Sequence, residues 1–166
     1  MIITMALLTQ SIKGTQDTLP AKSYQNQYME QSMLEIARNF GYHEIRTPVF
    51  EHTELFQRSV GDTTDVVQKE MYTFDDKGGR SITLRPEGTA GICRAAIENG
   101  LLGDALPLKV SYVINCFRYE KAQRGRFREF YQADIDVIGD GELDITNDAE
   151  IPAIIYTCLL YTSPSP

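Results

Sequence analysis

Two long strand-like runs in the second half of the sequence constrain the fold most strongly. Residues 108–119 and 126–138 are rich in β-branched and aromatic side chains, and only the polar segment 120–125 separates them. Two such runs joined by a short polar loop predict an antiparallel hairpin. Gly139-Asp140-Gly141 supplies the turn residues that would end it.

Helical spacing predicts a long helix near the start of the chain. Apolar residues recur at near-helical intervals between residues 21 and 40. Pro20 suits the first helical turn and Gly41 suits the C-terminal stop. Asp17 or Thr18 would cap the N-terminus of this helix.

Shorter elements follow from the same signals. Three further helices are predicted, over 52–60, 87–99 and 144–160. Residues 44–51 predict a strand that Pro48 interrupts. Runs 69–74 and 80–85 around the turn at 75–79 predict a second, shorter hairpin. Hairpin-joined strands combined with helices indicate an α+β fold, with a mostly antiparallel sheet flanked by helices.

The composition argues against several kinds of site. A hydrophobic content of 42% supports a folded core, and a net charge of −7 does not suggest a general nucleic-acid binder. The three cysteines, Cys93, Cys116 and Cys158, are odd in number and lack CxxC spacing. His43 and His52 are the only histidines. We therefore expect neither a disulfide framework nor a metal held by protein side chains.

The two ends of the chain differ from its middle. Residues 1–11 form a lead-in without the basic start of a signal peptide, and no run approaches the roughly 20 apolar residues of a membrane span. A cytoplasmic protein that does not contact membranes is expected. Residues 156–166 end in Ser163-Pro164-Ser165-Pro166 and depart from the preceding sequence. We interpret them as a non-native tail, with a genuine Ser/Pro-rich linker as the alternative.

Alternation along the second long strand separates two faces. A regular strand would place Phe127 to Val137, at odd positions, against the helices. The other face carries charges, an amide and one ring: Arg126, Arg128, Phe130, Gln132, Asp134 and Asp136. Because burying unpaired charge is costly, this row on a central strand predicts a polar ligand. Arginine suits phosphate, Phe130 suits stacking on a base, and Gln132 with Asp136 suits a cationic small molecule.

The loop between the two strands adds a local basic patch to an acidic chain. Five basic residues fall within eleven positions: Arg118, Lys121, Arg124, Arg126 and Arg128. Such a cluster favours nucleotide phosphates or the end of an RNA. The alternative is an ordinary solvated hairpin in which Arg118 and Glu120 form only a surface pair.

Several segments resemble the histidyl-tRNA synthetases, a family of class II aminoacyl-tRNA synthetases. Residues 117–120 and 126–130 are similar to class II motif 2, and residues 44–51 are similar to motif 1. Arg85-Pro86-Glu87-Gly88-Thr89 resembles the segment that holds the amino acid in this family, and residues 13–20 resemble its opening loop. The likeness runs from about Ile12 to Ile155. Ala122 stands where family members often have proline, a departure from which we expect little effect.

The resemblance implies a role for each matching residue. Arg118 would be the catalytic arginine on the α-phosphate of ATP, which arrives with Mg2+. Glu120 would accept from the adenine amino group, Arg126 would hold the γ-phosphate, and Phe130 would stack on adenine. Histidine would be held by four side chains: Glu87, Thr89, Gln132 and Asp136. Pro48 would lie at a homodimer interface formed by motif 1, and the acceptor end of tRNA(His) would be the second substrate.

The resemblance also implies that 12–155 is a partial class II catalytic domain. Motif 3, a histidine-specific segment and the anticodon-binding domain are not found in the 166 residues, so the chain alone is expected to be inactive. The rival interpretation is a non-catalytic regulatory paralogue from histidine biosynthesis that binds histidine or a partner enzyme. A prolyl- or threonyl-type synthetase and a plain α+β interaction domain are weaker alternatives, because Arg85-Pro86-Glu87-Gly88-Thr89 and the Gln132/Asp136 pair favour the histidyl type.

Overall fold

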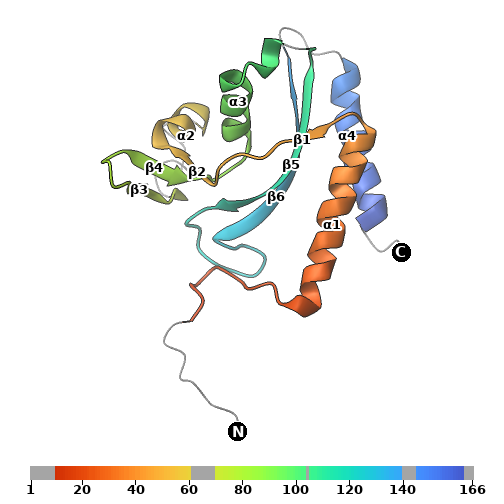
Figure 1. The fold of residues 1–166 in the computed structure, drawn as a ribbon. Helices are drawn as coiled ribbons and strands as arrows, with labels where there is room; N and C mark the ends of the chain where they lie inside the picture. The colour runs from red at the N-terminus through yellow and green to blue at the C-terminus, as the bar shows by residue number, and fades with distance from the viewer. Residues whose placement is uncertain (1–9, 61–69, 104, 140–144, 163–166) are drawn as a thin grey trace.

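The long hairpin forms the centre of the molecule. The computed structural model describes residues 10–60, 70–103, 105–139 and 145–162. Strands β5 (Leu108–Phe117) and β6 (Glu129–Ile138) pair antiparallel along their whole length. The short strand β1 (His43–Glu44) adds to β5 in parallel and completes a sheet of order β1-β5-β6 (Figure 1). The predicted hairpin is confirmed.

The connection between β5 and β6 is longer than the sequence suggests. Residues 118–128 lie outside both strands, and Gln123 pairs with Arg126 in a tight turn inside this connection. Gly125 adopts φ 79°, which glycine tolerates best. The prediction that the strand begins at Arg126 was therefore wrong, because this turn completes its own hydrogen bonds before the chain enters β6.

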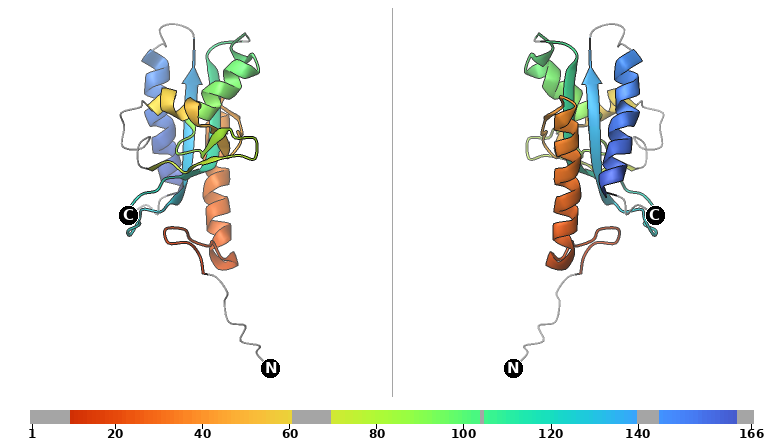
Figure 2. Two further views of the ribbon diagram at one scale, coloured as in Figure 1. Left: turned by 90° about the vertical axis from the view of Figure 1, so that its left-hand side faces the viewer. Right: turned by 90° about the vertical axis from the view of Figure 1, so that its right-hand side faces the viewer.

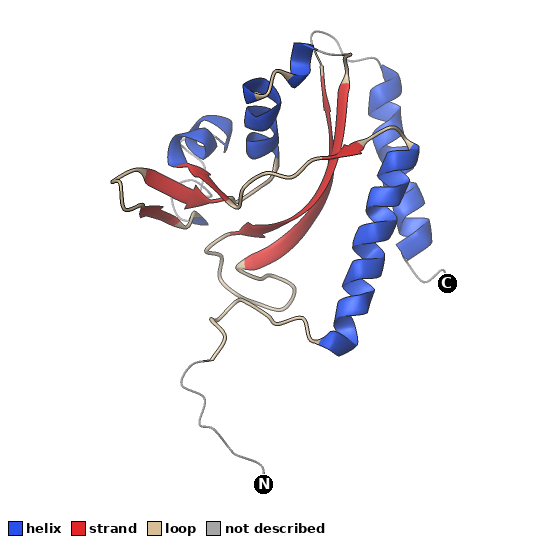
Figure 3. Cartoon of the chain, viewed as in Figure 1, coloured by secondary structure: helices blue, strands red, loops and turns tan. Residues whose placement is uncertain are grey.

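A second, smaller sheet holds the other predicted hairpin. Its order is β2-β4-β3, all antiparallel, with β2 (Phe50–His52), β3 (Thr73–Asp75) and β4 (Ser81–Leu84) (Figure 3). The predicted strand over 44–51 is divided, since β1 joins the main sheet and β2 joins this one. Pro48, which lacks an N–H, lies in the segment that passes between the two sheets.

Helices cover both faces of the main sheet. They are α1 (Pro20–Asn39), α2 (Thr53–Val60), α3 (Thr89–Glu98), the 3-10 turn η2 (Leu101–Gly103) and α4 (Ile145–Thr162). Helix α3 lies on one face of the main sheet, while α1 and α4 lie lengthwise along the other (Figures 1 and 2). This arrangement confirms the predicted α+β class.

Helix boundaries show where local signals succeed and fail. Helix α1 begins at Pro20, and Gly41 adopts φ 85° just beyond its end, as predicted. Its N-cap is Leu19, without a side-chain hydrogen bond, so the predicted Asp17 or Thr18 cap was wrong. The fixed φ of proline starts this helix without a capping side chain. The lead-in over 1–9, the helix end at Gly61, and Asp140 with Gly141 fall outside the described residues.

Two apolar clusters hold the layers together. On the α3 side, Ile92 packs against β5 through Val110, Tyr112, Ile114 and Cys116. On the opposite side, Ile36 and Ala37 of α1, Tyr42, and Ile154 of α4 form the second cluster. Partly buried Ile135 and Val137 of β6 join this second cluster, whereas Tyr131 is 65% exposed, so the odd-numbered face packs on helices only toward the end of β6. No helix within the described ranges is long and apolar enough to cross a membrane.

Tyr42 carries a buried polar atom that the second cluster does not satisfy. The residue is 1% exposed, and among the described residues its Oη finds no hydrogen-bond partner. Burial is the main cause that raises the pKa of Tyr42 to about 12, and the neighbouring Glu150 carboxylate is the second. The Glu150 carboxylate instead accepts from Lys109 Nζ at 2.8 and 3.0 Å.

Tyr42→Phe should therefore stabilise the fold. A buried hydroxyl without a partner costs about 1–3 kcal/mol, and phenylalanine removes it while keeping the ring. We expect the free energy of unfolding to rise by about 1 kcal/mol, measured by thermal and urea unfolding. A loss of stability would mean that the hydroxyl is bonded in solution, with Glu150 as the acceptor.

Candidate functional site

The polar row of β6 faces the same side as α3. In the β5–β6 register, Phe130 pairs with Cys116, Gln132 with Ile114 and Asp136 with Val110. Paired residues share a face in an antiparallel sheet, and these β5 partners belong to the cluster under α3. Phe130, Gln132 and Asp136 therefore lie on one polar surface opposite the N-terminal end of α3. We call this surface the β6 polar face.

Arg118 lies at one end of this face. Its guanidinium is 5.3 Å from the centroid of the Phe130 ring, and its Nε donates to the carbonyl of Pro86 at 2.8 Å. The ring and the carbonyl together hold a half-buried cation at a fixed position. Two residues that are predicted to bind ATP, Arg118 and Phe130, are thus brought together.

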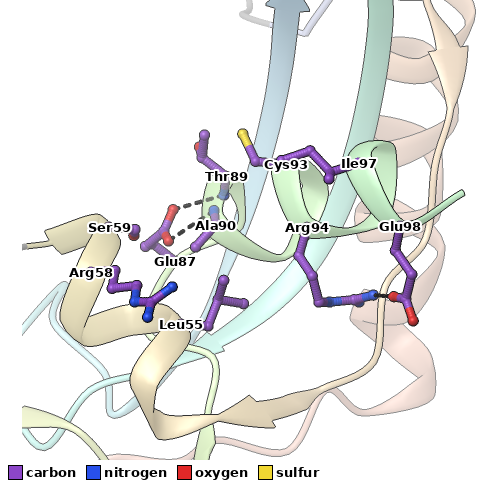
Figure 4. A pocket seen from close by; sticks show the side chains of 10 residues that line it. All are labelled: Leu55, Arg58, Ser59, Glu87, Thr89, Ala90, Cys93, Arg94, Ile97 and Glu98. Atoms are coloured by element: carbon purple, nitrogen blue, oxygen red, sulfur yellow. Dashed lines mark hydrogen bonds and ion pairs between the residues drawn. The ribbon is translucent and has the colours of Figure 1, made fainter. Parts of the chain in front are cut away.

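Glu87 and Thr89 lie at the N-terminus of α3. The Glu87 carboxylate accepts from the backbone N–H of Thr89 at 2.7 Å and from that of Ala90 at 3.1 Å (Figure 4). These bonds satisfy two of the free N–H groups at the helix start, where a negative charge is also favoured by the helix dipole. The sequence predicted that this helix begins at Glu87. These bonds explain why α3 begins instead at Thr89.

Tyr112 links the helix to the strand. Its hydroxyl donates to Asp136 Oδ2 at 3.0 Å and lies 3.4 Å from Thr89 Oγ1. Its ring lies so close to Gly88 that a Cβ there would stand 2.4 Å from it. Through Tyr112, two predicted histidine-binding residues, Thr89 and Asp136, come together at the end of the β6 polar face away from Arg118.

That end of the face is acidic. Burial raises the pKa of Asp136, and the neighbouring Asp134 and Glu87 carboxylates raise it further, while the Tyr112 hydrogen bond lowers it. Burial likewise raises the pKa of Asp134. Three carboxylates that repel one another would be relieved by a bound cation. Among the described residues, no group of three or more His, Cys, Asp or Glu side chains is arranged to hold a metal ion.

Gln132 lies between the two ends. Cys116 Sγ lies 2.9 Å from Gln132 Oε1, as a thiol donating to the amide oxygen. Burial raises the pKa of the Cys116 thiol to about 12, so the sulfur keeps the proton that this hydrogen bond needs. With its oxygen turned toward sulfur, the amide directs its NH2 group elsewhere.

Glu120 and Arg126 lie in the 118–128 connection and not on the strand. Arg126 Nη1 is 3.4 Å from Glu120 Oε2. Arg128 stacks on Tyr119, with its guanidinium 3.9 Å from the ring centroid, and its backbone N–H donates to Gly14 at 2.7 Å. The sequence placed Arg126 and Arg128 in one row with Phe130, and the structure corrects this. The two arginines belong to a loop that the segment around Gly14 supports.

Arg85 is a structural residue that the sequence pattern did not identify. It is 6% exposed and donates to Asn115 O and Oδ1, both at 2.7 Å, and to Thr47 O at 3.0 Å. A longer bond of 3.3 Å reaches the carbonyl of Pro48. Arg85 therefore ties the segment before α3 to β5 and to the passage between the two sheets.

A separate cavity of about 660 Å³ lies between α2 and α3. The described residues that line it are drawn in Figure 4: Leu55, Arg58, Ser59, Glu87, Thr89, Ala90, Cys93, Arg94, Ile97 and Glu98. Glu87 and Thr89 thus border both this cavity and the β6 polar face. No residue of β6 lines this cavity, so Phe130, Gln132 and Asp136 do not contact a ligand bound there.

Two residues of the polar face follow from strand register and not from motif. Tyr112 pairs with Asp134 across the hairpin, and Cys116 pairs with Phe130. An exact register assigned to the predicted hairpin would have placed both on the polar side. The sequence signal existed, but it required knowing where the connection between the strands begins.

Comparisons with known proteins point in one direction. A family model described as histidyl-tRNA synthetase matches residues 14–163. The chain is 57% identical over 150 residues to the histidine–tRNA ligase of Clostridium perfringens. The matched segment covers 90% of this chain and 36% of that protein. The chain is 59% identical over 133 residues to the enzyme of the same name from Acetivibrio thermocellus, covering 80% and 32%.

Solved structures show the same likeness. Apo Staphylococcus aureus histidyl-tRNA synthetase has a TM-score of 0.77 at 38% identity, covering 92% of this chain and 34% of that one. A Bacillus halodurans protein described as an ATP phosphoribosyltransferase regulatory subunit/histidyl-tRNA synthetase also has a TM-score of 0.77, at 28% identity, covering 97% and 40%. The chain spans about a third of the length of the curated relatives it matches. With a family model matched over residues 14–163, the chain belongs to the histidyl-tRNA synthetase family.

Proposed function

We propose that the protein containing this chain is a histidine–tRNA ligase of the cytoplasm, which activates histidine with ATP and transfers it to the acceptor end of tRNA(His). The observation that carries the proposal is the polarity of the β6 polar face. Arg118 over Phe130 offers a cation and a ring at one end, Thr89 and Asp136 offer acceptors at the other, and Glu87, which follows the Pro86 carbonyl that Arg118 contacts, lies between them. A nucleotide phosphate and an amino acid with cationic groups fit these two ends in that order.

Arg118 is the proposed catalytic residue. Attack of the histidine carboxylate on the α-phosphorus forms a P–O bond and breaks the bond to pyrophosphate, and negative charge grows on the α-phosphoryl oxygens. Because Pro86 and Phe130 already fix the guanidinium, it stabilises that charge without reorganising. Phe130 also suits stacking against the adenine ring.

Glu120 and Arg126 are proposed to act on the nucleotide from the loop. Glu120 would accept from the adenine amino group and Arg126 would hold the γ-phosphate. Their exposed contact of 3.4 Å is a weak one, since a solvent-accessible ion pair contributes about 0–1 kcal/mol. Binding of ATP with its Mg2+ would therefore separate Glu120 from Arg126 at little cost in free energy. Glu120 would gain the adenine amino group as a partner, and Arg126 would gain the γ-phosphate.

Residues 12–155 would be part of a class II catalytic domain, with 1–11 as a lead-in and 156–166 as a tail foreign to it. Pro48, in the passage between the two sheets, would face a second copy in a homodimer.

A chimera tests the proposed activity. The 150 matched residues of this chain would replace their counterpart in the Clostridium perfringens relative, giving a complete protein. We expect ATP–pyrophosphate exchange that depends on histidine and is at least 100-fold slower with proline or threonine, since a rival would leave acceptors of the site unpaired. Exchange with proline or threonine, and none with histidine, would contradict the assignment.

The regulatory paralogue is the second candidate, and the description of the Bacillus halodurans structure favours keeping it. Such a protein would bind histidine without charging tRNA. Charging of tRNA(His) by the chimera, compared with the unmodified Clostridium perfringens protein, separates the two. Histidine binding with neither exchange nor charging would favour the paralogue.

A further inference from the structure

Tyr112 occupies a position that no substrate-binding role explains. The residue is 1% exposed, and its ring belongs to the apolar cluster under α3. Its hydroxyl nevertheless emerges between Asp136 Oδ2, at 3.0 Å, and Thr89 Oγ1, at 3.4 Å. It is therefore a buried group that touches two proposed histidine-binding residues on different elements.

The protons available at these three groups fix the direction of the hydrogen bonds. An ionised carboxylate can only accept, so the single phenolic proton of Tyr112 points to Asp136. Burial raises the pKa of Tyr112, which keeps that proton in place. The remaining lone pair of Tyr112 can only accept, so the hydroxyl of Thr89 donates to it. The order of donation is Thr89 to Tyr112 to Asp136.

We propose that Tyr112 is a positioning residue that makes the amino-acid end of the β6 polar face an acceptor-only site. With its proton directed at Tyr112, Thr89 Oγ1 presents lone pairs to the ligand. With Oδ2 held by Tyr112, Asp136 presents Oδ1 at a fixed angle. The Glu87 carboxylate beside them is also an acceptor. This set matches a ligand whose amino group and side chain both bring N–H donors.

The inference rests on the proposed function and specifies how the same site selects its substrate. A hydroxyl side chain brings a single donor and no positive charge, so it could not satisfy an acceptor-only site as fully. The packing of Gly88 against the Tyr112 ring supports the role, because it fixes the start of α3 relative to β5. Tyr112 thereby holds the distance between Thr89 and Asp136.

Tyr112→Phe in the chimera is the direct test. The KM for histidine should rise about 10-fold or more, because the hydrogen bond to the charged Asp136 is lost in both the histidine complex and the transition state. The kcat and the KM for ATP should change less than about 3-fold, because the interaction is present in ground and transition states alike. A merely structural role would lower the Tm without this separation.

The pH profile gives a second readout. The groups that face Asp136 are Tyr112 on β5, Asp134 on its own strand, and Glu87 and Cys93 at α3. Among them only Tyr112 favours the ionised form of Asp136, so its loss should raise the pKa of Asp136. As the pH is lowered, Asp136 in the variant should take up its proton at a higher pH. Histidine binding by the variant should therefore weaken at a higher pH than histidine binding by the unmodified chimera. Titration of free histidine is common to both proteins and cancels.

Controls separate this inference from the proposed function. Tyr42→Phe, an equally buried tyrosine of the opposite cluster, should leave the KM and the pH profile unchanged. Thr89→Val, at an exposed position, should raise the histidine KM even if Tyr112→Phe proves too unstable to assay. Histidine binding measured by calorimetry provides a readout that does not need activity.

The outcomes divide cleanly. An active chimera whose histidine KM and pH profile are unaffected by Tyr112→Phe overturns the positioning role and leaves the proposed function standing. An inactive chimera whose histidine affinity falls in the variant supports the role and removes the enzyme. A chimera that binds no histidine overturns both.

Discussion

Arg118→Ala should slow histidine activation by the chimera about 100-fold or more, the usual cost of removing one donor from a developing oxyanion. The guanidinium is held by the Pro86 carbonyl and by the Phe130 ring, so water cannot take its place with the same alignment. Because the stabilised charge grows during the reaction, kcat should fall much more than the affinity for histidine. Single-turnover formation of histidyl-adenylate measures this step.

Two variants control for charge and position. Arg118→Lys keeps the charge but loses the planar fork, so its rate should fall between those of the unmodified protein and alanine. Arg124→Ala removes an exposed arginine of the same loop and should change the rate little. Near-normal turnover of Arg118→Ala, with an unchanged melting temperature, would remove Arg118 from the mechanism.

Arg85→Met should cause the largest loss of stability. The substitution leaves Asn115 Oδ1 and the carbonyls of Asn115 and Thr47 without their donor in a buried position. Each such group costs about 1–3 kcal/mol, so the free energy of unfolding should fall by about 3 kcal/mol or more. Thermal and urea unfolding of the chimera provide the measurement.

The matched control is Arg46→Met. Arg46 pairs with Glu44 at 2.7 Å, but its side chain is 81% exposed, and exposed pairs contribute little. The melting temperature should hardly change. If Arg85→Met were equally harmless, the hydrogen bonds of Arg85 would not be what joins the two sheets.

Local pattern predicted the elements that depend on local physics. The spacing of apolar residues before Gly41 identified α1, because Ile36 and Ala37 near its end must be buried. Turn residues between 75 and 79 identified the small hairpin, because Gly79 supplies a positive φ of 73°. The long β5–β6 pairing followed from two uninterrupted strand-like runs.

The sequence was less informative where distant residues decide the outcome. Arg85 appeared in a motif, but its burial arises because Asn115 and Thr47, from 30 and 38 positions away, converge on it. Arg126 was placed on a strand because alternation continues through it, whereas the turn with Gln123 takes it into the loop. The role of Tyr112 was not predicted, because no motif includes it. Tyr112 joins the site only through the register between β5 and β6.

A crystal structure of the chimera with a non-hydrolysable histidyl-adenylate analogue tests the location of the site most directly. We predict that the adenine ring stacks on Phe130, that Arg118 contacts the group replacing the α-phosphate, and that the histidyl moiety lies between Thr89 and Asp136. The opposing result is a ligand bound in the cavity between α2 and α3, with the β6 polar face empty. That finding would contradict the assignment of catalysis to this face of the sheet.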